Sequence, residues 1–157
     1  MLNKCFFVIA FLSLGVKCYS QTIQIIDFKT LKASYVTNSD TTYIVNFFAS
    51  WCSPCLKEIP EFINVSNETT NEKIKLIFVS LDAIKSCEES LIPLVKKYQI
   101  KGNVFVLDEG NSTEWINFVN PDWSGAIPST LIINSKTRLN KFVEGPITSS
   151  KLKKIIK

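Results

Sequence analysis

The sequence predicts an α/β protein with a central mixed β-sheet that is flanked by helices on both faces. Two continuous apolar segments, Tyr43–Ala49 and Ile74–Leu81, have the composition of strands that are buried on both sides. Two further strands are predicted at Thr130–Ile133 and Leu139–Val143, joined by a turn, and an amphipathic helix at Thr148–Ile156 follows them. Early alternation of strand and helix, followed by a hairpin and a helix, favours a mixed sheet in one domain.

The remaining elements follow from the spacing of apolar residues. A short amphipathic helix is predicted over Asp27–Tyr35, and a second helix begins at Pro54, which suits a first turn, and runs to about Val65. Ser86–Tyr98 is predicted to be helical, with Pro93 as a kink or a false start. The last two predicted elements are a strand, Val104–Leu107, and a short helix, Thr113–Val119.

The N-terminus has the pattern of a secretory signal peptide. Lys4 precedes the apolar run 5–16, and small residues at Cys18 and Ser20 place the cut after about Ser20. A membrane span needs about 20 apolar residues, so an uncleaved membrane anchor is the weaker alternative. A lipid anchor on Cys18 is also weaker, because Lys17 is a poor neighbour for lipoprotein processing. We therefore expect export from the cytoplasm.

The composition of the mature domain, residues 21–157, excludes several classes of function. The chain has no His, which excludes Ser-His-Asp and Cys-His catalysis and any zinc site built on imidazole. Removal of residues 1–20 leaves 16 basic and 14 acidic residues, which are spread along the chain. So small a positive charge predicts no nucleic-acid binding.

The strongest chemical signal is the motif WCSPC at 51–55, which follows a buried strand and opens a helix. A cysteine at a helix N-terminus faces unpaired N–H groups and the positive end of the dipole, so Cys52 is expected to favour the thiolate. Cys55 lies within reach on the same helical face, so the two can form a disulfide. A structural disulfide or a zinc site would explain the pair less well. So small a loop stabilises little, and a zinc site needs further ligands.

Two longer strings extend this pattern. The segment Val45–Pro60, VNFFASWCSPCLKEIP, is similar to the TlpA/ResA branch of bacterial cell-envelope thiol–disulfide oxidoreductases, and Gly125–Thr130 resembles their cis-proline loop. The resemblance implies the thioredoxin fold and exchange of disulfides with protein substrates. It also implies that the redox-active disulfide Cys52–Cys55 serves in place of a bound cofactor or metal. Electrons would come from a membrane donor or another thioredoxin-like partner.

The resemblance also assigns roles to single residues. Cys52 would be the nucleophile and Cys55 the resolving thiol, the order that their expected exposure also favours. Pro128 would be the cis-proline, and Ile127 would offer its backbone to an extended substrate. Trp51 and Pro54 are expected to contribute to the substrate-binding rim. Trp123 is expected either at this rim or in the core.

Glu58 is a candidate acid one turn after Cys55. It would either be exposed and complement the helix N-terminus or, as the resemblance implies, be a buried acid that tunes the cysteine pair. Asn46 supports the second interpretation, because it is neutral where thioredoxin itself has a buried Asp. Pro60 indicates either a kinked helix or an early helix end after Ile59.

The resemblance favours a reductant, for example of the haem-binding cysteines of apocytochromes c. An oxidant that installs disulfides and a non-catalytic thioredoxin-like binding module remain alternatives. Peroxide reduction by a lone thiol is disfavoured, because the resolving cysteine lies inside a CxxC motif. Cys87 lies outside the motif and is expected to be a small buried hydrophobe or an unpaired thiol.

Overall fold

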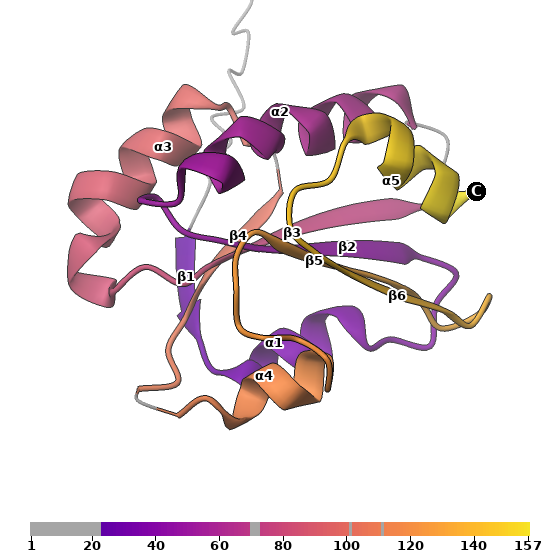
Figure 1. The fold of residues 1–157 in the computed structure, drawn as a ribbon, viewed down its shortest axis with the longest axis horizontal. Coiled ribbons are helices and arrows are strands. Elements are labelled where there is room, and N and C mark those ends of the chain that lie inside the picture. Colours follow the sequence, from indigo (N-terminus) through magenta and orange to yellow (C-terminus); the bar gives the residue numbers. More distant parts are fainter. Residues whose placement is uncertain (1–22, 70–72, 101, 111) are drawn as a thin grey trace, which may run out of the picture.

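A computed structural model of the chain contains a six-stranded mixed sheet with helices on both faces (Figure 1). It describes residues 23–69, 73–100, 102–110 and 112–157, so the predicted signal peptide lies outside the described residues. The strand order is β1-β4-β3-β2-β5-β6, in which β1 to β4 pair in parallel and β5 and β6 are antiparallel. The strands are β1 Ile23–Ile26, β2 Thr42–Phe48, β3 Ile74–Ser80, β4 Asn103–Leu107, β5 Ser129–Asn134 and β6 Leu139–Glu144.

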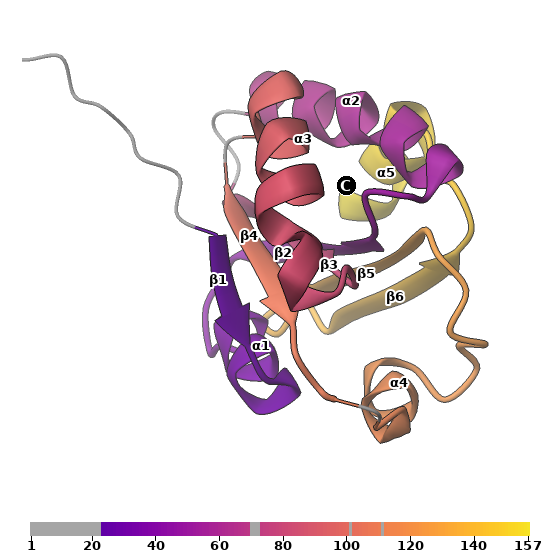
Figure 2. The same ribbon diagram turned by 90° about the vertical axis from the view of Figure 1, so that its left-hand side faces the viewer.

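The helices form two layers, with α2, α3 and α5 on one face of the sheet and α1 and α4 on the other (Figures 1 and 2). This arrangement confirms the predicted fold class. The helices are α1 Phe28–Tyr35, α2 Ser53–Glu68, α3 Ile92–Lys97, α4 Glu114–Val119 and α5 Ser149–Ile156.

Two parts of the chain differ from the sequence prediction. The edge strand β1 was not predicted, because its four residues are partly exposed and form their ladder with β4, far along the chain. The helix expected over 86–98 has a 3-10 turn, Ile84–Ser86, and a π-helical turn, Cys87–Leu91, before α3. Pro93 lies in the first turn of α3, directly after the π-helical turn, and has no N–H to donate to the preceding turn, so the helix changes type close to it.

Helix α2 continues through Pro60 to Glu68, so an early end after Ile59 is wrong. One face of α2 packs on the sheet with Ile59, Phe62 and Val65 fully buried, and this packing stabilises the helix despite the hydrogen bond that Pro60 removes. Cys52 caps the helix and Ser53 and Pro54 begin it, as the motif predicted.

Strand β2 supplies both halves of the core, because successive side chains of a strand point to opposite faces. Ile44 and Phe48 belong to the apolar cluster that includes residues of α2, α3 and α5. Val45 and Phe47 belong to the cluster with α1 and α4. Asn46 shares the face of Ile44 and Phe48, so a polar side chain is placed under α2.

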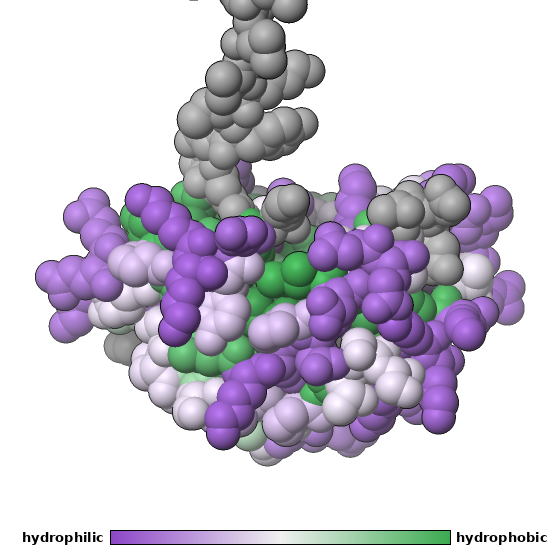
Figure 3. Space-filling model, turned by 90° about the horizontal axis from the view of Figure 1, so that it is seen from above, coloured by the Kyte–Doolittle hydropathy of each residue, from purple (hydrophilic) through white to green (hydrophobic). Residues whose placement is uncertain are grey.

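The outer surface of the α2, α3 and α5 layer is largely hydrophilic, with apolar strips between the helices (Figure 3). Lys97 and Lys151 are among its exposed residues. Of the helices that the structure describes, none has the length and apolar character that a membrane crossing requires.

We predict that Phe47→Ala will lower the free energy of unfolding by about 3–5 kcal/mol, measured by urea denaturation of the disulfide-bonded protein. Phe47 is fully buried and packs against Trp115 and Trp123, so its removal leaves a cavity. Phe118→Ala is the control, since Phe118 is 67% exposed, and should change the free energy by less than about 1 kcal/mol. Equal losses in the two variants would contradict this assignment of the core.

Candidate functional site

The two cysteines of the motif form a disulfide at the N-terminus of α2, with their Cα atoms 5.3 Å apart. Cys52 is the N-cap residue, and the backbone N–H of Cys55 points at its Sγ from 3.3 Å. The motif follows the carboxyl end of β2 directly, where parallel α/β sheets place their functional sites. The Sγ of Cys52 therefore lies where unpaired N–H groups favour negative charge.

Of the two cysteines of the motif, Cys55 is the more deeply buried. Trp51 is 71% exposed, Cys52 6% and Cys55 0%, and Pro54 is exposed. The order agrees with the sequence prediction, although in the disulfide form Cys52 is itself largely covered. A partner that approaches the disulfide from solvent meets Trp51 and the edge of Cys52 before Cys55.

The peptide bond between Ile127 and Pro128 is cis, and its loop faces the disulfide. The carbonyl oxygen of Ile127 lies 3.8 Å from the Sγ of Cys52. Pro128 is buried and has no N–H, while Ile127 is half-buried. The N–H of Gly145 donates to the carbonyl of Pro128 at 2.8 Å, which holds the loop in place. The structure thus brings Ile127 and Pro128 to the cysteine pair.

Trp123 belongs to the core and not to the rim. It is 4% exposed, its ring packs against Phe47 and Trp115, and its Nε1–H donates to the carbonyl of Ala126 at 2.8 Å. This hydrogen bond satisfies the indole and fixes the loop that leads to Ile127.

Glu58 is 3% exposed, so it is a buried acid, and the exposed alternative is wrong. One carboxylate oxygen accepts from Nδ2 of Asn46 at 2.7 Å, and the other accepts from the N–H of Ile147 at 2.9 Å. Burial raises the pKa of Glu58 above its ordinary value, while the bonds from Ile147 and Asn46 act against that rise. A carboxyl group in such a position exchanges protons at higher pH than an exposed one.

A second buried carboxyl group, Asp82, lies at the other side of the motif and was missed from the sequence. It is 4% exposed and accepts from the N–H and Oγ–H of Ser50 at 2.9 and 2.6 Å, and from the Oγ–H of Ser80 at 2.6 Å. These bonds hold the residues just before Trp51. The sequence signal that could have revealed Asp82 is its position just after β3, because β3 runs parallel to β2, which leads into the motif.

Cys87 is the free cysteine of the described residues and is half-buried in the π-helical turn. Burial raises the pKa of its thiol, and the negative charges of Asp82 and Glu88 raise it further. Within the described ranges, no three His, Cys, Asp or Glu side chains are grouped so that they could hold a metal ion.

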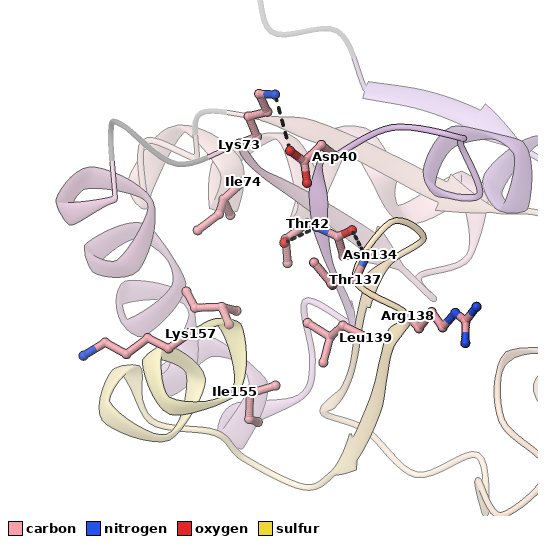
Figure 4. Close-up of a pocket in the computed structure, with 11 residues that line it drawn as sticks. Asp40, Thr42, Lys73, Ile74, Asn134, Thr137, Arg138, Leu139, Ile155 and Lys157 are labelled. Carbon is pink, nitrogen blue, oxygen red and sulfur yellow. Dashed lines mark hydrogen bonds and ion pairs between the residues drawn. The ribbon is translucent and has the colours of Figure 1, made fainter.

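A cavity of about 840 Å³ lies at the other end of the sheet (Figure 4). Its walls come from the starts of β2 and β3, the β5–β6 hairpin and the end of α5, whereas the cysteines follow the end of β2. Arg138 and Lys157 extend outward from its rim, on opposite sides (Figure 4). This cavity is therefore separate from the disulfide.

Residues 15–142 match the model of the AhpC/TSA family. The chain belongs to this family. Its six-stranded mixed sheet and its disulfide at the start of α2 are those of a thioredoxin-like thiol–disulfide oxidoreductase, as the motif predicted.

Two curated relatives of this chain from Bacillus subtilis (strain 168) are themselves named thiol-disulfide oxidoreductases. The chain is 24% identical over 118 residues to sporulation thiol-disulfide oxidoreductase A, a match over 75% of this chain and 68% of that one. It is 27% identical over 106 residues to thiol-disulfide oxidoreductase ResA, over 68% of this chain and 54% of ResA. The match thus spans about half of the length of ResA. The predicted resemblance to ResA-type proteins is confirmed.

The solved structure of StoA from Bacillus subtilis superposes on this chain with a TM-score of 0.57 and 25% sequence identity. The superposition covers 78% of this chain and 87% of StoA. The thioredoxin-like fold therefore extends over most of the described residues.

We predict that Glu58→Gln will stabilise the oxidised protein increasingly as the pH rises. The folded-state pKa of Glu58 is above its ordinary value of 4.5, so wild-type stability is full below that value and falls as the pH rises through the folded-state pKa. The glutamine side chain of the variant has no charge to gain and avoids this fall. Urea denaturation from about pH 4 to about pH 8 measures the difference in the free energy of unfolding.

Glu61→Gln is the matched control, one turn further along α2. The N–H of Ser149 donates to Glu61 and lowers its pKa, so its ionised form is favoured in the folded state. Its replacement should cost stability at neutral pH and cost less in acid, the opposite sign to Glu58→Gln. A difference between Glu58→Gln and wild type that is constant with pH would contradict the buried-acid assignment.

Proposed function

We propose that this oxidoreductase is exported and that it reduces disulfides of exported proteins through Cys52. The observation that carries the proposal is the position of the Cys52 Sγ, 3.8 Å from the Ile127 carbonyl of the cis-proline loop, with a buried acid one turn behind Cys55. An attacking sulfur, a backbone edge for an extended substrate and a proton acceptor then belong to one site.

In the first step the reduced protein attacks its substrate. The Cys52 thiolate forms a bond to one substrate sulfur, the substrate disulfide breaks, and the leaving substrate thiolate takes a proton from water. The backbone of Ile127 would hold the substrate strand, while Trp51 and Pro54, both exposed, provide an apolar rim beside it.

In the second step Cys55 resolves the mixed disulfide. Its thiol gives its proton to the Glu58 carboxylate, and the resulting thiolate bonds to the Cys52 Sγ as the bond from Cys52 to the substrate breaks. The products are the Cys52–Cys55 disulfide and the second substrate thiolate, which water protonates. Because Cys55 and Glu58 are both buried one turn apart on α2, water reaches neither directly.

The reducing direction is supported by the charges around the pair. A dithiol is a strong oxidant when its thiolate form is strongly stabilised. This chain has no His for that purpose, and the ionisable group buried beside the pair is an acid, Glu58. A carboxylate there disfavours a second negative charge on sulfur, which favours the disulfide and a low reduction potential.

Export is supported by the signal-peptide pattern of residues 1–20, with cleavage after about Ser20 and release to the periplasm or cell envelope. Electrons would come from a membrane donor or another thioredoxin-like protein, because the cycle consumes one dithiol per substrate disulfide. Apocytochromes c, with paired haem-binding cysteines, have the substrate chemistry that this site suits.

We predict that Cys52→Ser will abolish catalysis and that Cys55→Ser will accumulate mixed disulfides. With insulin as the test substrate and dithiothreitol as the donor, Cys52→Ser should show the uncatalysed rate, since no nucleophile remains. Reduced Cys55→Ser, freed of dithiothreitol before insulin is added, should form a covalent adduct through Cys52 that is visible by non-reducing electrophoresis and disappears on reduction.

Cys87→Ser is the control and should retain the wild-type rate, because Cys87 lies outside the motif. Full function of Cys52→Ser would instead indicate a non-catalytic binding module, and an adduct that persists in Cys52→Ser would place the reactive thiol elsewhere.

We predict a reduction potential near or below about −250 mV, in the range of thioredoxin-like reductants. The measurement equilibrates the purified protein with defined thiol buffers and counts free Cys52 and Cys55 by alkylation. A value near about −120 mV would make the protein an oxidant and would contradict the proposed direction.

A further inference from the structure

Asn46 connects the buried acid to the cis-proline loop. Its Nδ2 donates to Glu58 Oε1 at 2.7 Å and to Thr130 Oγ1 at 3.3 Å, and it lies 3.5 Å from the carbonyl oxygen of Ser129. Ser129 and Thr130 directly follow Pro128. One amide group therefore contacts both the proton acceptor of α2 and the strand that carries the substrate-binding loop.

The other half of this amide has no partner. Asn46 is 1% exposed, and among the residues that the structure describes its Oδ1 is the buried side-chain oxygen or nitrogen without a hydrogen bond. Buried acceptors are nearly always paired, so an unpaired one beside an ionisable group requires an explanation. The explanation lies in what Glu58 needs in each of its two protonation states.

Ionised Glu58 accepts hydrogen bonds and cannot donate one, so it requires the NH2 group of Asn46, as observed. Protonated Glu58 has an O–H to donate and requires an acceptor. A half-turn of the amide exchanges Nδ2 and Oδ1 and places Oδ1 opposite both Glu58 and the Thr130 hydroxyl, each of which can donate to it. Each orientation of the amide thus presents to Glu58 the group that one of its protonation states requires.

We propose that Asn46 is a positioning residue whose amide turns over when Glu58 gains or loses its proton. The proposal deepens the proposed function, on which it rests for the source of that proton. When Cys55 gives its proton to Glu58, the turned amide accepts the new O–H and keeps the carboxyl group in place. When a donor reduces the disulfide, the proton returns to Cys55 sulfur and the amide turns back.

The surroundings of Glu58 make its titration a specific probe of Asn46. Asn46 faces it from β2, and the Ile147 N–H faces it from the segment between β6 and α5. Along α2, Cys55 lies one turn before Glu58 and does not titrate in the disulfide, and Glu61, one turn after it, accepts from the N–H of Ser149. Burial raises the pKa of Glu58 and the two hydrogen bonds lower it, with no contribution from a charged side chain of the described residues.

The first test is a titration of the oxidised wild-type protein by NMR. The 13C signal of the Glu58 carboxyl and the side-chain 1H–15N signals of Asn46 should move with the same midpoint. In Glu58→Gln the Asn46 signals should not change with pH. Asn46 signals that stay unchanged through the Glu58 titration would overturn the proposal, and this test needs no Asn46 variant to fold.

The second test compares Asn46→Leu with Asn134→Leu. Asn134 is the matched control, since it is also buried in the sheet, at 5% exposure, and donates to Thr42 at the opposite end of β2 from the cysteines. Asn46→Leu removes a donor to the ionised acid, so the Glu58 midpoint should move to higher pH. Release of a preformed mixed disulfide between Cys52 and a test peptide should slow roughly tenfold near neutral pH.

Asn134→Leu should lose stability without moving either the midpoint or the release rate. If Asn46→Leu behaves in the same way, Asn46 has a structural role alone and the proposal fails. Should Asn46→Leu not fold, Asn46→Asp keeps the shape, and its second carboxylate should also raise the Glu58 midpoint. Because the titrations use oxidised protein without substrate, failure of the reductant role would be seen separately, in the insulin assay.

Discussion

Glu58 places a carboxyl group in the interface between α2 and the sheet, where 3% of the residue is exposed. A buried carboxylate is destabilising unless donors reach it, and here the donors come from β2 and from the segment before α5. Satisfying this one side chain therefore requires α2, β2 and the entry to α5 to meet in one register. The same packing buries Cys55 one turn away, so the fold places one sulfur of the disulfide and an acid on the same buried face of α2.

The segment from the last residue of β6, Glu144, to Ile147 links the two sides of the site. Glu144 accepts from the N–H of Ser124, the N–H of Gly145 donates to Pro128, and the N–H of Ile147 donates to Glu58. Within four residues this segment thus holds the loop that faces Cys52 and the acid behind Cys55.

Two buried carboxyl groups flank the redox motif. Asp82 accepts hydrogen bonds from Ser50, just before the motif, and Glu58 lies one turn after Cys55. Their hydrogen-bond partners are hydroxyl, amide and backbone groups, all neutral. The helix N-terminus favours a thiolate on Cys52, whereas the carboxyl groups oppose further negative charge nearby. The balance between these opposed effects is one contribution to the reduction potential of the pair.

The sequence by itself determined most of the elements and the reactive pair, because the signals for both are local. Apolar runs predicted β2 and β3, and a cysteine followed by Pro54 predicted the start of α2. The tertiary structure decided what depends on distant partners: that Glu58 is buried, that Trp123 is in the core, that helix α2 passes Pro60, and that β1 exists. The N–H that donates to Glu58 belongs to Ile147, which is 89 residues away in the sequence. The carbonyl beside the Cys52 Sγ belongs to Ile127, at a separation of 75 residues. Periodicity and capping act over a few residues, whereas burial and hydrogen bonding depend on which surfaces meet when the chain folds.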